Sequence, residues 1–192
     1  MYLNQFSAVI QGGNETAGGY VELQHCQIYQ LRLRNDRSLQ ADARVEIDGK
    51  HVGTWRLHSH QTITLERPAN DNGQFTFYRL NSPEAQAAAL NSGDPNLGLV
   101  KVTFTPEKRM VYRGSGGQSL ETSFSATTRG AGGTGLSGYS FQEFDVAQNI
   151  EYDYSQETVI HLRLVERVTS GEQIQGIRPL TQYSTPVPPR VF

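Results

Sequence analysis

The fold is most legible in residues 43 to 80, which read ARVEIDGKHVGTWRLHSHQTITLERPANDNGQFTFYRL. From Ala43 to Ile47, apolar and polar residues alternate with the period of a strand that has one buried face. The dipeptide Asp48-Gly49 follows, and such a pair accepts the positive φ angles of a type I′ hairpin turn. The stretch therefore predicts two antiparallel strands joined by a tight turn.

The parity of the apolar positions changes after this turn. Val52 stands at an even position, whereas Trp55 and Leu57 stand at odd ones. Because a one-residue slip would turn one of these sets toward solvent, we predict a β-bulge near Gly53 that lets both sets face inward. Two further strands are expected, over residues 61–66 and from Phe75 onward.

Short strand patterns recur along the rest of the chain, at residues 4–11, 20–34, 97–105, 140–146 and 158–165. The last of these has apolar residues at both parities, which predicts a central strand covered on both faces. Ser82 as N-cap and Pro83 at the first helical position predict one short helix near residues 83–91. We therefore expect an all-β fold, an antiparallel two-sheet β-sandwich of the jelly-roll or immunoglobulin-like type, with that one short helix.

Length and composition favour one domain followed by a tail. The chain has 192 residues, of which 36% are apolar and 19% charged, and it is long enough to fold without disulfides. We predict a single sandwich domain over residues 1–175 and an extended Pro-rich tail over residues 176–192. The tail has four prolines in its last 14 residues, which excludes a core strand. Extended, it would run about 3 Å per residue and reach a neighbouring subunit.

The charge pattern argues against general nucleic-acid binding. The net charge is −2, with 14 Arg, 3 Lys and no contiguous basic run, whereas nucleic-acid binding needs clustered cations. The preference for Arg fits protein interfaces, although the base composition of the genome accounts for it equally well. Arg32 and Arg34 share the exposed face of a predicted strand, which is either a solvated face or an interface for acidic partners.

The N-terminus and the single cysteine of the chain indicate where in the cell the protein is made. Cys26 is the only cysteine, so no intrachain disulfide is possible, and a buried inert thiol within a strand is expected. The N-terminal MYLNQFSAVIQGG lacks a basic region followed by a long apolar core, so no signal peptide is predicted. No apolar run approaches the roughly 20 residues of a membrane span. We expect synthesis in the cytoplasm and exit, if any, by a route such as lysis.

No motif in the chain predicts catalysis. Ser, His and Asp occur without a G-x-S-x-G elbow. Residues 130–135 read GAGGTG, but no helix of a βαβ unit follows and no lysine completes a P-loop. His58 and His60 would share one face of a strand and could both reach a metal, but no third ligand is evident, and a polar patch at a strand end is the plainer interpretation. The sequence thus predicts no enzyme, no cofactor and no metal.

Two stretches are the candidates for interaction. Residues 129–138, RGAGGTGLSG, hold five glycines, which weaken a strand, so a loop is expected there. The candidate interaction residues lie in or beside this loop and in the tail: Arg129, Leu136, Tyr139, Arg178, Tyr183, Arg190 and Phe192. An alternative ligand platform consists of Trp55, His58 and His60, with Tyr139 as a second aromatic surface for a sugar ring. Trp55 alternates with Leu57, however, which favours a core position.

The succession of short strands, one small helix and a Pro-rich tail resembles the β-sandwich modules of phage and virus particles, including minor capsid, decoration and spike proteins. The resemblance covers the strands and the tails, and no family-specific motif accompanies it. It implies a non-enzymatic structural protein that assembles with copies of itself or with a larger scaffold, such as a virus particle. The alternatives are a carbohydrate-binding module or adhesin and, third, a hydrolase on a jelly-roll scaffold.

Overall fold

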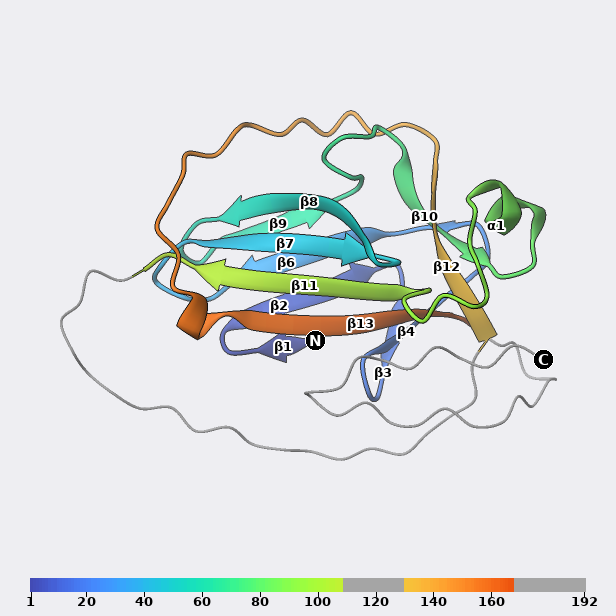
Figure 1. The fold of residues 1–192 in the computed structure, drawn as a ribbon, viewed down its shortest axis with the longest axis horizontal. Helices are drawn as coiled ribbons and strands as arrows, with labels where there is room; N and C mark the ends of the chain where they lie inside the picture. The colour runs from blue at the N-terminus through green and yellow to red at the C-terminus, as the bar shows by residue number, and fades with distance from the viewer. Residues whose placement is uncertain (109–129, 168–192) are drawn as a thin grey trace.

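The computed structural model describes residues 1–108 and 130–167, which form two β-sheets packed face to face (Figure 1). The small sheet has the order β1 (Tyr2–Leu3), β2 (Phe6–Gln11), β6 (Gln30–Asn35), β9 (Thr62–Leu65). The large sheet has the order β5 (Gln27–Ile28), β10 (Gln74–Arg79), β12 (Gly130–Ser137), β13 (Thr158–Glu166), β11 (Leu99–Pro106), β7 (Ala41–Ile47), β8 (Lys50–Leu57). The predicted all-β sandwich of two antiparallel sheets is confirmed.

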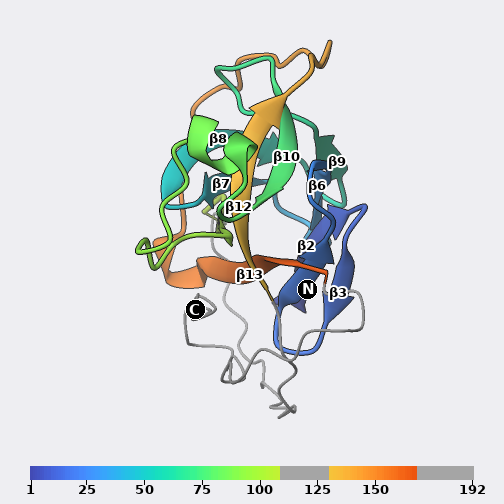
Figure 2. The same ribbon diagram turned by 90° about the vertical axis from the view of Figure 1, so that its right-hand side faces the viewer.

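Two short strands extend the large sheet. β4 (Tyr20–Leu23) lies beside β13 in the one parallel pairing of the described strands, and β3 (Asn14–Thr16) pairs with β4. Figure 2 shows the small sheet and the large sheet as two layers. No helix within residues 1–108 and 130–167 is long and apolar enough to cross a membrane.

The core lies between the two layers and is built from the alternating side chains of both. The inward residues of β2 and β6, such as Phe6 and Leu33, are fully buried, as are those of β7 and β11, such as Val45 and Phe104. The rings of Phe6 and Phe104 stack across the interface with centroids 4.5 Å apart. This stacking joins the small sheet to the large one.

The hairpin at the centre of the opening stretch forms as predicted. Asp48 and Gly49 have φ angles of 51° and 74°, as a type I′ turn requires. The pairing of β7 with β8 then shifts by one residue, because Val45 faces Gly53 while Glu46 faces His51. The predicted bulge is therefore confirmed, and the missing side chain of Gly53 leaves room for the ring of Trp55.

The glycine-rich stretch is a strand, so the prediction of a loop at residues 129–138 is wrong. β12 pairs with β13 through Gly130 and Ala131, and with β10 from Gly132 to Ser137. The glycines are required because large side chains lie directly on the strand. A Cβ atom at Gly132 would overlap the ring of Phe77. A Cβ atom at Gly133 would come within 2.6 Å of Leu97.

Two other sequence predictions are corrected. Residues 20–34 are not one strand, since a tight turn with Cys26 at φ 61° separates β4 from β5, and Cys26 is exposed rather than buried. Residues 140–146 alternate in burial but join no sheet. The predicted helix exists as α1 (Pro83–Ala87), and the Oγ of its N-cap Ser82 accepts a hydrogen bond from the backbone N–H of Ala85.

Asp48 also ties the hairpin to two distant segments. Its Oδ1 accepts a hydrogen bond of 2.5 Å from the backbone N–H of Gly98, and its Oδ2 one of 2.7 Å from that of Thr134. Burial raises the pKa of Asp48 to about 6, against an ordinary value of 3.8. The carboxylate thus joins the β7–β8 turn, the loop before β11 and the middle of β12.

The raised pKa of Asp48 predicts a pH-dependent stability. Between about pH 4 and pH 6 the folded protein binds more protons than the unfolded chain, so rising pH lowers the stability that Asp48 contributes. Relative to Asp48→Asn, the wild type is expected to lose on the order of 3 kcal/mol in unfolding free energy between pH 4 and pH 7. Urea denaturation of both proteins across this range measures the difference, and a difference independent of pH would contradict the expectation.

The glycines of β12 predict a second, local effect. Gly132→Ala places a methyl group in the ring of Phe77 and is expected to lower the free energy of unfolding by roughly 1 to 3 kcal/mol. Gly93→Ala is the matched control, since its new Cβ meets nothing closer than Asn91 Oδ1 at 3.6 Å. Urea denaturation should therefore show the control near the wild type. Equal stability of the two variants would show that β12 can shift away from Phe77.

Candidate interaction site

An extended segment crosses the open side of the sandwich. Residues 138–153, here called the strap, leave the end of β12 and reach η1 (Tyr154–Gln156) without entering a sheet (Figure 1). β8 is the last strand of the large sheet and β9 that of the small sheet, and the strap touches both. It therefore covers the side on which both sheets present an edge strand.

A first clip holds the strap to β9 through a side-chain amide. Gln142 Nε2 donates a hydrogen bond of 2.6 Å to Thr64 O, and Gln142 Oε1 accepts one of 3.0 Å from Glu66 N. The amide thus makes the two bonds that the backbone of a neighbouring strand would make. Because an unpaired strand edge is a template for other chains, this contact blocks part of the β9 edge.

Arg67 completes the first clip. Its buried guanidinium donates hydrogen bonds to the backbone oxygen atoms of Gln142, Pro68 and Asp71. It also lies 4.5 Å from the ring centroid of Phe144, and that ring meets Trp55 edge-on with centroids 5.6 Å apart. The strap is therefore anchored by carbonyl hydrogen bonds and by an aromatic side chain that enters the sandwich edge.

A second clip holds the other end of the strap. Arg56 and Asp42 form a two-bond ion pair of 2.5 and 3.0 Å, and the hydroxyl of Tyr152 donates a bond of 2.5 Å to Asp42. Arg56 also donates to Gln148 O at 2.6 Å. The hydrogen bonds with Asp42 raise the pKa of both Tyr152 and Arg56. At neutral pH the network is therefore held by a charged pair and a protonated phenol.

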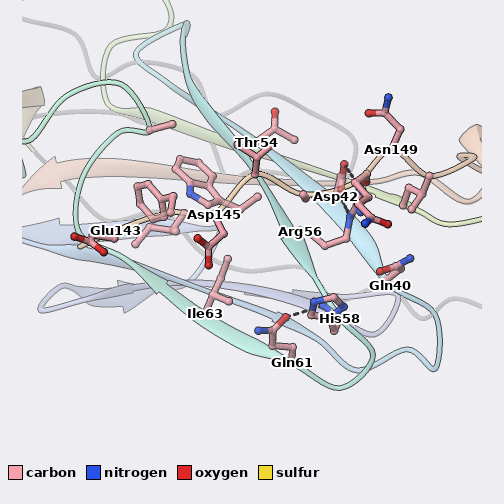
Figure 3. A pocket seen from close by; sticks show the side chains of 18 of the residues that line it. Gln40, Asp42, Thr54, Arg56, His58, Gln61, Ile63, Glu143, Asp145 and Asn149 are labelled. Carbon is pink, nitrogen blue, oxygen red and sulfur yellow. Dashed lines mark hydrogen bonds and ion pairs between the residues drawn. The ribbon is translucent and has the colours of Figure 1, made fainter. Parts of the chain in front are cut away.

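Between the two clips the strap stands over a groove of about 940 Å³ (Figure 3). The groove lies between β8, β9 and the strap, and both polar and apolar side chains line it. Carboxylates and amides come from the strap, from β7 and from the turn before β9: Asp42, Gln61, Glu143, Asp145 and Asn149. Such a wall can form hydrogen bonds to a polar ligand, and no constellation on it has the geometry of a catalytic centre among the described contacts.

Many exposed side chains of the strap are apolar or acidic. Seven large apolar side chains are exposed within residues 1–108 and 130–167, and four of them lie at or beside the strap: Tyr139, Phe141, Val146 and Tyr154. Phe141 is 88% and Val146 99% exposed. Residues 130–162 contain no Lys or Arg, whereas carboxylates stand at positions 143, 145, 151, 153 and 157. Apolar groups gathered on one segment in this way mark a contact surface.

The structure places only some of the predicted interaction residues. Tyr139 is exposed on the strap, where its ring meets that of Phe141 with centroids 4.8 Å apart, and Leu136 is exposed on β12. The other five predicted interaction residues lie outside the described residues: Arg129, Arg178, Tyr183, Arg190 and Phe192.

The predicted ligand platform does not form as expected. Trp55 is only 8% exposed, because its ring packs against Gly53 and Phe144, which agrees with the core position that its alternation favours. His58 and His60 follow β8 in a turn, where His60 has a φ angle of 57°, so they do not share a strand face. Neither histidine belongs to a group of three metal-ligating side chains in the part of the chain that the structure describes.

A cluster that the sequence did not predict lies at the α1 end of the molecule. Cys26 Sγ and a carboxylate oxygen of Glu84 are each 3.4 Å from His25 Nε2. The Nδ1 atom of His25 accepts a hydrogen bond from the backbone N–H of Arg79, so the neutral ring carries its proton on Nε2. A metal would need the lone pair of Nε2, and a catalytic triad would need its two partners on different nitrogen atoms. The cluster is therefore a hydrogen-bonded link between α1 and the turn at Cys26.

Comparison of the chain with protein-family models, with curated proteins and with solved structures finds no match. The site is therefore defined by its geometry. Its two clips were missed by sequence reasoning because their partners lie about 75 to 110 positions apart in the chain. The absence of Lys and Arg from residues 130–162 was the one visible signal of an acidic segment.

The first clip predicts a local change in stability. Gln142→Leu keeps the approximate volume of the side chain but leaves Thr64 O and Glu66 N without their partner, which is expected to cost about 1 to 2 kcal/mol. Native-state hydrogen exchange should show faster exchange at the amide of Glu66, by roughly tenfold. Gln148→Leu is the control, because that exposed residue contributes a backbone carbonyl rather than its side chain. Unchanged exchange at Glu66 would contradict the role of the amide.

Proposed function

We propose that this protein is a non-enzymatic structural protein that assembles with copies of itself or with a larger scaffold through its strap. The observation that carries the proposal is the outward face of the strap, where Phe141 and Val146 are almost fully exposed. An apolar side chain of the same segment can pack against the core, as the partly buried Phe144 does. The exposed pair therefore serves something other than the stability of the isolated chain.

The two clips support this assignment because they fix the ends of the strap and leave the residues between them on the surface. Gln142 and Tyr152 hold the segment near its two ends, and the residues between them lie on the surface. A contact segment that is already held in an extended form loses less conformational entropy on binding than a free loop. This arrangement suits a protein whose task is to bind another protein.

In its narrower form, the proposal makes the chain a component of a virus particle, of the minor capsid, decoration or spike type. The support for it is the resemblance of the strand pattern to the β-sandwich modules of such particles, together with the presented strap. Particle proteins need extended surfaces that meet neighbours, and the strap supplies one.

A second candidate is a carbohydrate-binding module or adhesin, and the groove favours it. Side-chain amides and carboxylates of the kind found at Gln61, Glu143 and Asn149 hydrogen-bond sugar hydroxyls. The aromatic partner for a sugar ring would then be Tyr139 or Phe141, because Trp55 is packed against Gly53 and Phe144.

Removal of the exposed apolar groups tests the proposal. The full-length chain is expected to have a mass above 21.4 kDa in light scattering at micromolar concentration, or to sediment with large particles from the source cells. Phe141→Ser combined with Val146→Ser should return it to a free monomer without a loss of stability, since both side chains are exposed. Ile28→Ser, an exposed apolar side chain on β5, is the control and should leave the assembly intact.

Two outcomes contradict the assembly proposal. One is a wild type that is a monomer in light scattering and also does not sediment with large particles. The other is an assembly that tolerates the double serine variant. Glycan-array binding by the wild type that is lost on Tyr139→Ser or Phe141→Ser would instead favour the carbohydrate alternative.

A further inference from the structure

We infer that the partner of the strap is a second copy of this chain, and that the acidic strap docks on the arginines of the small sheet. The inference rests on the proposed function and names its partner. Glu143 and Asp145 of one copy face Arg32 and Arg34 of the other. Two copies related by a two-fold axis form both contacts at once.

The outer face of the small sheet supplies the basic surface. On β6, Leu31 and Leu33 point into the core, whereas Arg32 and Arg34 are exposed. Arg32 stands in register between Val9 of β2 and Thr64 of β9. It has neither a hydrogen bond nor an ion pair with any described residue. The carboxylates next to these arginines are already engaged, because Asp36 pairs with Arg34 and Glu66 accepts a hydrogen bond from Gln30. Arg32 is therefore open to an acidic partner.

Arg34 differs from Arg32 in having an ion pair within its own chain. Its Nε lies 2.6 Å from Asp36 Oδ1, and the Arg34 side chain is still 56% exposed. The pair uses one edge of the guanidinium, which leaves further N–H donors for a second carboxylate. Arg34 can therefore bind a carboxylate of the second copy while it keeps its ion pair with Asp36.

The strap supplies carboxylates with a matching spacing. Glu143 and Asp145 are exposed, and neither has a hydrogen bond or an ion pair with a described residue. Like the two arginines, they stand two positions apart on extended chain, so each pair of residues is separated by roughly 6 to 7 Å. The two acidic groups can thus meet the two guanidinium groups in register, and each arginine can bind a carboxylate with two bonds.

The apolar groups of the strap fit the same surface. Tyr139 and Phe141 stand four and two positions before Glu143, and a guanidinium stacks on such rings more readily than an ammonium does. Across the small sheet, Tyr2 is 60% exposed in register with Ser7, which faces Arg34. Both surfaces thus combine charges of one sign with exposed aromatic groups.

The position of the two surfaces favours a closed dimer. The acidic strap and the basic face border one another at Thr64, which accepts a bond from Gln142 of the strap and stands beside Arg32 in the ladder. When complementary patches lie side by side, a two-fold axis between them brings each patch onto its complement in the other copy. Both contacts are then satisfied, and no surface is left to extend a filament.

Charge reversal on each side tests the inference. The wild type is expected to sediment as a dimer whose dissociation constant rises with salt. Glu143→Arg with Asp145→Arg, and separately Arg32→Glu with Arg34→Glu, should each raise that constant at least tenfold. All four residues are exposed, so both variants should fold, and thermal melting verifies this. If a charge-reversed variant does not fold, the neutral variants Glu143→Gln with Asp145→Asn, or Arg32→Gln with Arg34→Gln, take its place.

A mixture of the two reversed proteins provides the decisive measurement. Each reversed strap then faces a reversed sheet, so an equimolar mixture should form a heterodimer with an affinity near that of the wild type. The control for net charge is Lys50→Glu with Lys108→Glu, which changes two exposed lysines elsewhere. Mixed with the strap variant, this control should form no such heterodimer.

The outcomes separate this inference from the proposed function. A wild-type dimer that both reversals leave intact would overturn the docking surface while the assembly function stands. A wild type that binds only large particles would overturn the second copy as the partner. Loss of assembly on both reversals without rescue in the mixture would also reject the pairing of Glu143 and Asp145 with Arg32 and Arg34.

Discussion

The close approach of side chains to the backbone of β12 is the constraint on which the rest of the structure depends. Its first two residues pair with β13 and the others with β10, so the strand carries the large sheet from its centre to the β10 end. Phe77 and Leu97 rest directly on Gly132 and Gly133. No residue with a Cβ atom would allow this packing without a shift of the sheet, so the entropic cost of glycine is offset by burial of large apolar groups.

Two buried charged side chains hold the loop before β11, and one of them, Asp48, also binds β12. The carboxylate of Asp48 accepts hydrogen bonds from the backbone N–H of Thr134 in β12 and from that of Gly98 in the loop before β11. Arg163 of β13 is buried and donates hydrogen bonds to Leu97 O and Pro95 O in the same loop. A loop held from both sides by buried charges has little freedom, and it fixes the start of β11 between β7 and β13.

The strap connects this rigid end to the candidate site. Because β12 delivers the chain to the open side of the sandwich, the segment from residue 138 must return across β9 and β8 to reach η1 and β13. Gln142 blocks an edge of β9, and Arg56 with Asp42 holds the far end of the strap. The fold therefore protects its strand edges with a segment that still exposes Phe141 and its carboxylates, which links edge protection to the proposed contact surface.

The local pattern of the sequence determined the strands of the hairpin, the type I′ turn at Asp48, the bulge at Gly53 and the cap of α1, because each depends on residues within a few positions. It also determined the outward arginines of β6. Only the tertiary structure decided that the glycines of β12 form a strand and that residues 140–146 form a strap rather than a strand. Those outcomes depend on contacts with Phe77, Leu97 and Arg67, which lie tens of residues away, and no local periodicity records them.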